Sequence, residues 1–481
     1  MTLLAAGTDV FTLSNLGGTI RARTSTDGGA SFKRGIAIDT SNAPNMAVIN
    51  LEGAAAGNGV IYGNIDIAAA DEIHVRNGET VFDGIVNPDG TTEGSLAIHS
   101  GGTLYLVNQP HGAVSTTGTP TVNSAYDGAA GVNVNSFAVE DGATLALQLA
   151  SFPTTEGSFP TVMANTVTLG ATSGLEVRPS SWNGLYNDNY YFDNVIKASN
   201  AAALTGTFDP TKVVTNTGTP LLQVATLYNQ DTDGGDVDIT IQRVGFGDVA
   251  GLTVNEASAG NGIENVYAPT LTGPFAGLLG NLFLLNAADY PVALSQLSGD
   301  QYAGYLQGLR NHSMQLNGLV SDQLDCAISI DGPQKCSDRD GEVRLWMLGS
   351  YNDVSVDTDV NSPGYDSENW SALLGADYTT GNFTVGAFGG YRDSRMDFDR
   401  NNGRIKSDGW QLGAFGAYDV GSFYIRGIGS YSDLNGESRR DISILSTQGT
   451  ALGQPDATIT SLYGEAGARV NVGAKSWLTP F

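Results

Sequence analysis

The chain has 481 residues, of which 63 are glycine and 15% are charged, and its net charge is -27. This length exceeds the size at which one hydrophobic core keeps growing, so two or more structural units are expected. The apolar share of 41% is too high for a disordered chain, and the abundant glycine disfavours a helical protein. The acidic charge argues against nucleic acid as a partner, because phosphate binding needs a basic face.

Residues 1–250 show short alternating strands separated by turns that contain Gly, Asn or Asp. One phrase, a glycine turn that enters an apolar strand, occurs as NGETVF at 77–82, GGTLYL at 101–106 and DGATLAL at 141–147. Further strands of this kind are expected at 60–67, 165–170 and 236–242. The irregular spacing of the turns suits solenoid coils of ~20 residues with inserted loops. The pattern predicts a right-handed parallel β-helix or irregular β-solenoid, and one or two β-sandwiches are the alternative.

The segment 251–340 changes to short helical runs and is expected to join two domains. Residues 300–324 place Tyr, Leu and Val at helical spacing and predict one long helix. Its interior holds Gly304, Gly308 and Gly318, each of which costs about 1 kcal/mol relative to alanine. Close approach of surrounding backbone is the usual reason for such glycines, as in a helix threaded through a narrow pore.

Residues 341–481 form a run of long alternating strands. The expected strands are 343–353, 369–379, 383–398, 405–420, 423–442 and 457–473, with a seventh that begins at Trp477. Tight turns follow the second, fourth and sixth strands, whereas long polar connections follow the first and third and a looser one follows the fifth. Alternately long and short connections are typical of an antiparallel transmembrane β-barrel.

Four consecutive strands of this run carry an aromatic side chain at each end of one face, always eight residues apart. The pairs are Trp370 and Tyr378, Phe383 and Tyr391, Trp410 and Tyr418, and Phe423 and Tyr431. Eight residues at ~3.3 Å each, in strands tilted by about 40°, span roughly 20 Å, close to the ~25 Å apolar band between the aromatic girdles of a membrane barrel. A soluble sheet also alternates, but four repeats of one period favour the membrane.

Polar residues occupy the other face of the same strands and suit a wet lumen. They include Asp377, Arg426, Glu465 and Arg469. Arg310 on the helix and these wall residues suggest pairing between helix and wall, worth about 1 kcal/mol or less for each pair in a wet pore.

Three segments resemble parts of the type V secretion autotransporters of Gram-negative bacteria. DVDITIQRVGFGDVAGLTVNE at 236–256 resembles the end of the passenger, and ALSQLSGDQYAGYLQGLRNHSMQLNGLVSDQL at 293–324 resembles the linker helix. EVRLWMLGSYNDVSVD at 342–357, with the strands after it, resembles the translocator barrel. Residues 1–235 match only the loose glycine-turn style of passengers.

The resemblance implies a twelve-stranded barrel in the outer membrane, surrounded by lipid and lipopolysaccharide, with the linker helix in its lumen. The passenger is then expected to cross the membrane with the aid of the barrel assembly machinery and to remain at the cell surface, where its ligand is unknown. About six of the twelve strands are present, so an incomplete barrel is expected. The reading frame is therefore expected to continue beyond Phe481 and to begin upstream of Met1 with an export signal.

Cys326 and Cys336 are ten positions apart and are the two cysteines of the chain. In an exported protein we expect them to form a local disulfide on the periplasmic side, with two free thiols as the alternative. A loop this short would gain about 3 kcal/mol in the entropic description of disulfides.

Catalytic and metal-binding motifs are sparse. The four histidines have no metal-ligand spacing, and no G-x-S-x-G phrase is present. DTDGGDVD at 231–238 has the composition of a calcium loop but occurs once, so a hairpin turn is expected there. We expect no enzyme activity, no cofactor and no metal site, and a structural or adhesive passenger. The alternatives are a polysaccharide-acting passenger, whose site would be assembled from distant coils, and a diffusion porin with an accessory domain.

Overall fold

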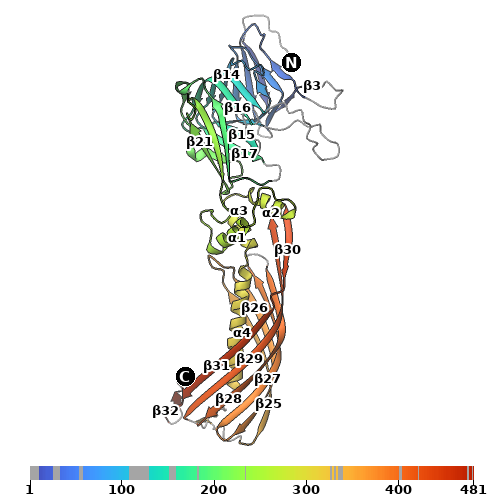
Figure 1. Ribbon diagram of the computed structural model, residues 1–481, viewed down its shortest axis with the longest axis vertical. Coiled ribbons are helices and arrows are strands. Elements are labelled where there is room, and N and C mark those ends of the chain that lie inside the picture. The colour runs from blue at the N-terminus through green and yellow to red at the C-terminus, as the bar shows by residue number, and fades with distance from the viewer. Residues whose placement is uncertain are drawn as a thin grey trace. The chain divides into compact units, whose positions relative to one another are not determined.

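The structure is a computed structural model that describes residues 10–480 except for 25–32, 54–57, 108–128, 151–158, 181–183, 233, 325–327, 330–331, 334–339, 400–402, 421, 474–475 and 479. The chain divides into two compact units (Figure 1). The first contains residues 1–249 and 264–290, and the second contains residues 250–263 and 291–481. No helix in the described part of the chain is long and apolar enough to cross a membrane.

Two parallel sheets dominate the first unit. One sheet runs in the order β1 (Phe11–Leu16), β6 (Ala47–Glu52), β9 (Glu72–Arg76), β12 (Ser95–Ile98), β14 (Gly131–Val139) and β16 (Thr161–Leu169). The other runs in the order β2 (Thr19–Arg21), β7 (Gly59–Tyr62), β10 (Gly78–Asp83), β13 (Gly102–Leu106), β15 (Thr144–Ala150), β17 (Gly174–Ser180) and β20 (Val213–Thr215). The chain alternates between the two sheets, so each successive coil adds one parallel strand to each sheet.

Shorter elements complete this arrangement. The strands β5 (Ile36–Asp39), β8 (Asn64–Asp66) and β11 (Ile85–Val86) pair in parallel and lead into β14, and β19 (Leu204–Thr205) pairs with β16. A small antiparallel pair joins β3 (Arg23–Thr24) to β4 (Lys33–Arg34). Single helical turns lie at η1 (Ala201–Ala203) and η2 (Pro210–Lys212).

Strand register stacks like residues into a continuous core. Ile61, Phe82, Leu106, Leu147 and Val177 lie opposite one another in successive strands of the second sheet, and all are buried. The three repeated glycine-turn phrases form neighbouring strands of this stack, because β10, β13 and β15 pair in that order. Parallel pairing of this kind belongs to stacked coils, whereas a β-sandwich is built from antiparallel sheets.

An antiparallel ribbon ends the first sheet. It contains β18 (Asn189–Lys197), β22 (Asp236–Arg243) and β21 (Leu222–Tyr228). Rings of Phe246, Tyr267 and Phe283, the last of them next to α2 (Pro274–Leu282), pack together beside it. Arg243 donates hydrogen bonds of 2.7 and 2.9 Å to Glu264, and this contact holds the pKa of the Glu264 carboxyl below its usual range.

The second unit is an antiparallel sheet with a long helix on one face. Its strands are β25 (Val343–Val356), β26 (Tyr365–Thr380), β27 (Phe383–Phe398), β28 (Arg404–Asp419), β29 (Phe423–Ile444), β30 (Thr447–Gly453) and β31 (Ala457–Ala468). Smaller antiparallel pairs join β23 (Ile328–Ser329) to β24 (Gly332–Pro333), and β32 (Val470–Gly473) to β33 (Ser476–Leu478). The helices are α1 (Val254–Glu264), α3 (Asp289–Leu297) and α4 (Asp300–Leu324).

Several strand boundaries differ from the expected ones: β25 continues to Val356, and the expected strand 457–473 is divided into β31 and β32. β26 begins at Tyr365, four residues before the expected start at Asn369, because it stays paired with both β25 and β27 there. The connection expected after the fifth strand contains an extra strand, β30, which forms a hairpin with the end of β29. β29 is 22 residues long, and β31 pairs only with its residues Phe423 to Leu434. The backbone groups at the other end of β29 would otherwise be unpaired, and they pair with β30.

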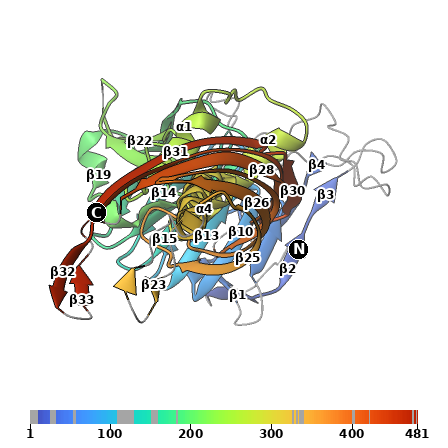
Figure 2. The same ribbon diagram turned by 90° about the horizontal axis from the view of Figure 1, so that it is seen from below.

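The sheet curves around α4 (Figure 2), so that one face is concave and holds the helix. Side chains alternate between buried and exposed along β26 to β29, as the period of a strand requires. The buried set faces α4, and the exposed set forms the convex face.

Candidate functional site on the C-terminal sheet

The convex face of the sheet carries two rows of exposed aromatic side chains. One row contains Trp370, Tyr391, Trp410 and Tyr431, and the other contains Tyr378, Phe383, Tyr418 and Phe423. Ring centroids lie 6.4 Å apart for Trp370 and Tyr391, and 4.7 Å apart for Phe383 and Tyr418. The register of β27 and β28 aligns the rows, because Tyr391 lies opposite Trp410 and Phe383 lies opposite Tyr418. The eight aromatics predicted from their spacing thus bound one continuous band.

Exposed aliphatic side chains fill this band. Leu374, Val385, Leu412 and Ile425 lie between the two aromatic rows and are about half exposed or more. A contiguous apolar surface that spans four strands is rare on soluble proteins and marks contact with a membrane or a partner. Flanking aromatic rows are the feature of a lipid-facing barrel surface.

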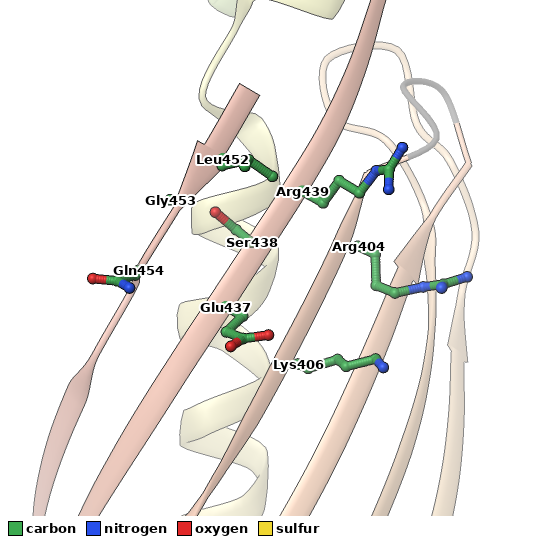
Figure 3. A pocket seen from close by; sticks show the side chains of 8 residues that line it. All are labelled: Arg404, Lys406, Glu437, Ser438, Arg439, Leu452, Gly453 and Gln454. Carbon is green, nitrogen blue, oxygen red and sulfur yellow. The ribbon is translucent and has the colours of Figure 1, made fainter. Parts of the chain in front are cut away.

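Charged side chains replace the apolar ones beyond the Trp370 row. Arg404 and Lys406 on β28 and Glu437 and Arg439 on β29 line an open hollow of about 700 Å³. Figure 3 shows the two arginines and the lysine extending from neighbouring strands towards the same side. A charged side chain is costly in lipid. Along β28 and β29 the exposed side chains change from apolar to charged. One edge of the lipid-facing band therefore lies between the Trp370 row and these charged residues.

The concave face binds α4 through two apolar clusters. The first joins Tyr305 and Leu309 of the helix to Tyr365, Met396, Phe398, Ile405 and Leu434 of the wall. The second joins Leu316, Val320 and Leu324 to Leu373, Phe388, Phe415 and Ile428. Full burial of one such side chain stabilises by about 1.5–3 kcal/mol, so these contacts supply most of the affinity between helix and wall.

Wall arginines hold the C-terminal end of α4. Arg426 donates to the Ser321 main-chain oxygen at 3.1 Å, and Arg344 donates to the Gln323 oxygen at 2.6 Å. Both oxygens belong to the last four residues of a helix that ends at Leu324, where carbonyl groups have no partner within the helix. The last turn of α4 contains no basic residue, so the wall supplies the cations that the negative end of the helix dipole favours.

Each of these arginines is itself paired with a wall carboxylate. Arg344 binds Asp377 at 2.8 Å, and the indole nitrogen of Trp346 donates to the same carboxylate at 3.1 Å. Arg426 binds Glu465 at 2.8 Å. The carboxylates thus orient the two guanidinium groups towards the helix end. Sequence reasoning found Asp377, Arg426 and Glu465 but missed Arg344, although the alternation of β25 places Arg344 at an inward position.

The structure corrects the expectation for Arg310. Its side chain is exposed and forms no ion pair with the described residues, because Arg310 lies outside the stripe of α4 that the wall buries. Arg469 was also expected to pair with the helix, but it binds Asp419 of the wall at 2.8 Å. The wall arginines that contact α4 therefore bind its main-chain oxygens, and Arg310 makes no ion pair with the described wall residues.

Polar contacts lie between and beyond the two apolar clusters. His312 lies 3.2 Å from the Gln411 amide oxygen, and Asn317 donates to the Ser461 hydroxyl at 2.9 Å. Arg392 is 1% exposed and donates to Asn369 at 3.2 Å, whereas its Nε and Nη1 have no partner among the described residues. Buried polar groups of this kind are satisfied by water or ions, as in a hydrated lumen.

The three glycines of α4 have different surroundings. A Cβ at Gly304 would lie 2.8 Å from the Phe398 ring, and a Cβ at Gly308 would lie 3.1 Å from the sulfur of Met396. No atom lies within 4 Å of a Cβ at Gly318. Close approach therefore explains the first two glycines and does not explain Gly318.

Two other predicted features have different outcomes. Cys326 and Cys336 lie outside the described residues, and their disulfide stays a prediction. Within 231–238, Asp236 accepts main-chain hydrogen bonds from Gln230 and Asp231 at 2.8 and 3.1 Å, which is the geometry of a turn. In the described part of the chain, no group of three or more His, Cys, Asp or Glu side chains is placed to hold a metal ion.

Comparison with known proteins agrees with the geometry of this sheet. Residues 345–481 match the family described as the autotransporter beta-domain. No curated protein and no solved structure matches the chain. The matched residues contain the aromatic rows, the lipid-facing band and the wall that binds α4. Residues 345–481 therefore carry an autotransporter β-domain, which implies a location in the outer membrane with the passenger exposed at the cell surface.

Proposed function

We propose that the C-terminal sheet and α4 export and anchor the N-terminal unit, which serves as a structural or adhesive β-solenoid passenger. The observation that supports this proposal most is the position of α4 along the concave face, while the convex face carries the lipid-facing band. A chain that leaves the first unit and follows α4 along the concave face of the wall stays tied to the membrane without a spanning helix.

The parallel sheets of the first unit suit a passenger of this kind. Each coil contacts only its neighbours, so such a stack can form progressively from one end as the chain emerges. The sequence of this unit contains no catalytic phrase such as G-x-S-x-G. We therefore propose a role in adhesion or surface structure rather than in catalysis.

The first experiment tests display and anchoring. In cells that carry the protein with Cys326 and Cys336 replaced by serine, a single cysteine is placed at Thr168 or at Ser430. Thr168 is exposed on β16, whereas Ser430 is buried on the concave face of β29. A membrane-impermeant maleimide should label Thr168→Cys on intact cells and leave Ser430→Cys unlabelled. Labelling of Thr168→Cys only after lysis would refute display at the surface.

A second experiment tests the adhesive role. Cells that display the protein should bind to surface-coated matrix proteins or glycans, or to one another, more strongly than cells that display the C-terminal unit alone. Release of reducing ends from polysaccharides by the full-length protein, without such binding, would favour the enzymatic alternative.

A further inference from the structure

The charged hollow lies on the same face of the sheet as the lipid-facing band (Figure 3). On β28, Arg404 and Lys406 precede Trp410 by six and four residues. On β29, Arg439 follows Tyr431 by eight residues. Even separations along a strand put all of these side chains on the convex face, in line with the aromatic row. The hollow therefore continues the lipid-facing surface beyond the edge of its apolar band.

The hollow lies at the end of the sheet where α4 begins. The Tyr302 hydroxyl, in the first turn of α4, lies 3.0 Å from the hydroxyl of Ser438, which lines the hollow. Arg440 of the same strand donates to the main-chain oxygen of Ser298, just before the helix. The chain enters α4 from the first unit, so this end of the sheet faces the cell surface. On this point the inference rests on the display of the passenger proposed above.

Like charges face one another across the strands of the hollow. Arg404 lies directly opposite Arg439 of β29, and Lys406 lies directly opposite Arg395 of β27. Such positions bring Cβ atoms within about 4.5–5.5 Å, where like charges destabilise a sheet. The chain has 23 Lys and Arg residues against 50 Asp and Glu residues, so its composition does not explain four neighbouring cations. An anion bound between them would remove the repulsion.

The carboxylates around the hollow leave its arginines free to bind such an anion. Asp397 pairs with Arg404, and Asp441 pairs with Arg439. The two arginine side chains are 46% and 64% exposed, and exposed pairs of this kind contribute about 1 kcal/mol or less. Each guanidinium can therefore turn to a stronger acceptor at little cost. Glu437, which also lines the hollow, would repel an anion.

We propose that this hollow binds the phosphorylated sugar headgroup of lipopolysaccharide in the outer leaflet. The planar guanidinium group forms two parallel hydrogen bonds to a phosphate, and the lysine adds a point charge. Arg404, Lys406 and Arg439 extend from two neighbouring strands, so they reach several phosphate oxygens of one headgroup together. The headgroup is held while the acyl chains of the same lipid lie against the apolar band.

The height of the hollow selects this lipid over a phospholipid. Lys406 and Arg404 lie four and six residues beyond Trp410, which amounts to roughly 10–15 Å at ~3.3 Å for each residue and a tilt of about 40°. The headgroup layer of a phospholipid bilayer is only about 5–8 Å thick on each side. A headgroup built from phosphorylated sugars extends far enough to meet the hollow.

The test uses the full-length chain in micelles of an uncharged detergent and measures lipid binding by native mass spectrometry. Three lipids are compared: rough lipopolysaccharide with a phosphorylated inner core, the same lipid after removal of its phosphates, and phosphatidylglycerol. The wild type should bind the first at least tenfold more strongly than either of the others.

Substitutions of the lining residues should change this binding in both directions. Arg404→Gln and Arg439→Gln should each weaken it by about fivefold, and the double variant by about 25-fold. Glu437→Gln removes a charge that repels phosphate and should strengthen binding. Arg310→Gln removes an exposed cation of α4, away from the hollow, and should leave binding unchanged. The heat-induced gel mobility shift checks that each variant is folded.

Equal binding by the wild type and the Arg404→Gln, Arg439→Gln double variant would overturn the proposal. Equal binding of phosphatidylglycerol or of the lipid without phosphates would also overturn it. Displacement of the lipid by millimolar inorganic phosphate would assign the hollow to a free anion and overturn the lipid as its occupant. Because binding is measured on purified protein, loss of binding with intact surface labelling would refute this site alone. Binding without surface labelling of Thr168→Cys would refute the proposed display alone.

Discussion

The glycines of α4 offer a graded test of how tightly the wall encloses the helix. Gly304→Ala places a Cβ 2.8 Å from Phe398 and 3.3 Å from Tyr365, and both rings are buried in the same cluster. Moving a packed ring costs about 1–3 kcal/mol, whereas alanine gains about 1 kcal/mol over glycine in a helix. Gly304→Ala should therefore loosen α4 by about 1 kcal/mol. Gly318→Ala meets no atom and should stabilise the helix by about 1 kcal/mol.

Hydrogen exchange of the α4 peptides, followed by mass spectrometry in micelles, measures this difference. Exchange should be about fivefold faster in Gly304→Ala and about fivefold slower in Gly318→Ala, because about 1.4 kcal/mol corresponds to a factor of ten. Gly308→Ala should lie between the two, since the flexible Met396 side chain can move aside. Slower exchange in Gly304→Ala, equal to that of Gly318→Ala, would refute the packing argument.

Three further substitutions test the core, an ion pair and the wall. Phe82→Ala removes a buried ring from the stacked core and should lower the free energy of unfolding of the first unit by about 3–5 kcal/mol, as measured by urea titration. Contact with Arg243 lowers the pKa of Glu264, so its contribution to stability is present above its usual pKa and is lost as the pH falls through the lowered value. Glu264→Gln should flatten the stability profile below the usual pKa of 4.5; an unchanged profile would show that the pair does not cause it. Asp377→Asn leaves Arg344 without its charged partner and should cost about 1–3 kcal/mol, visible as a lower temperature of heat-induced gel mobility shift.

Local patterns in the sequence determined the elements of the C-terminal half. The eight-residue spacing of aromatic residues depends only on the rise and two-residue period of a strand, so Trp410 and Tyr418 had to share one face. The helix expected at 300–324 is α4, because its apolar stripe follows the 3.6-residue period of a helix. Repeated glycine turns likewise identified strands β10, β13 and β15, which are neighbours in one sheet.

Tertiary structure decided which side chains meet. Arg310 was the obvious cation on the helix, but the rotation of α4 against the wall leaves it exposed and presents the Ser321 and Gln323 oxygens to wall arginines instead. Such a choice depends on the angle and depth at which a helix packs, and no local pattern encodes either quantity.

The contact between His74 and His99 in the first unit shows the same limit. His74 and His99 meet because the coil between β9 and β12 brings Ala97 opposite His74, which leaves His99 two positions further along. One residue more or fewer in that coil would turn one of the rings to the opposite face of the sheet. The sequence by itself determined periods, turns and faces, since these arise within a few residues. Contacts between distant residues required the register of the stacked coils and the curvature of the sheet, which only the folded chain as a whole defines.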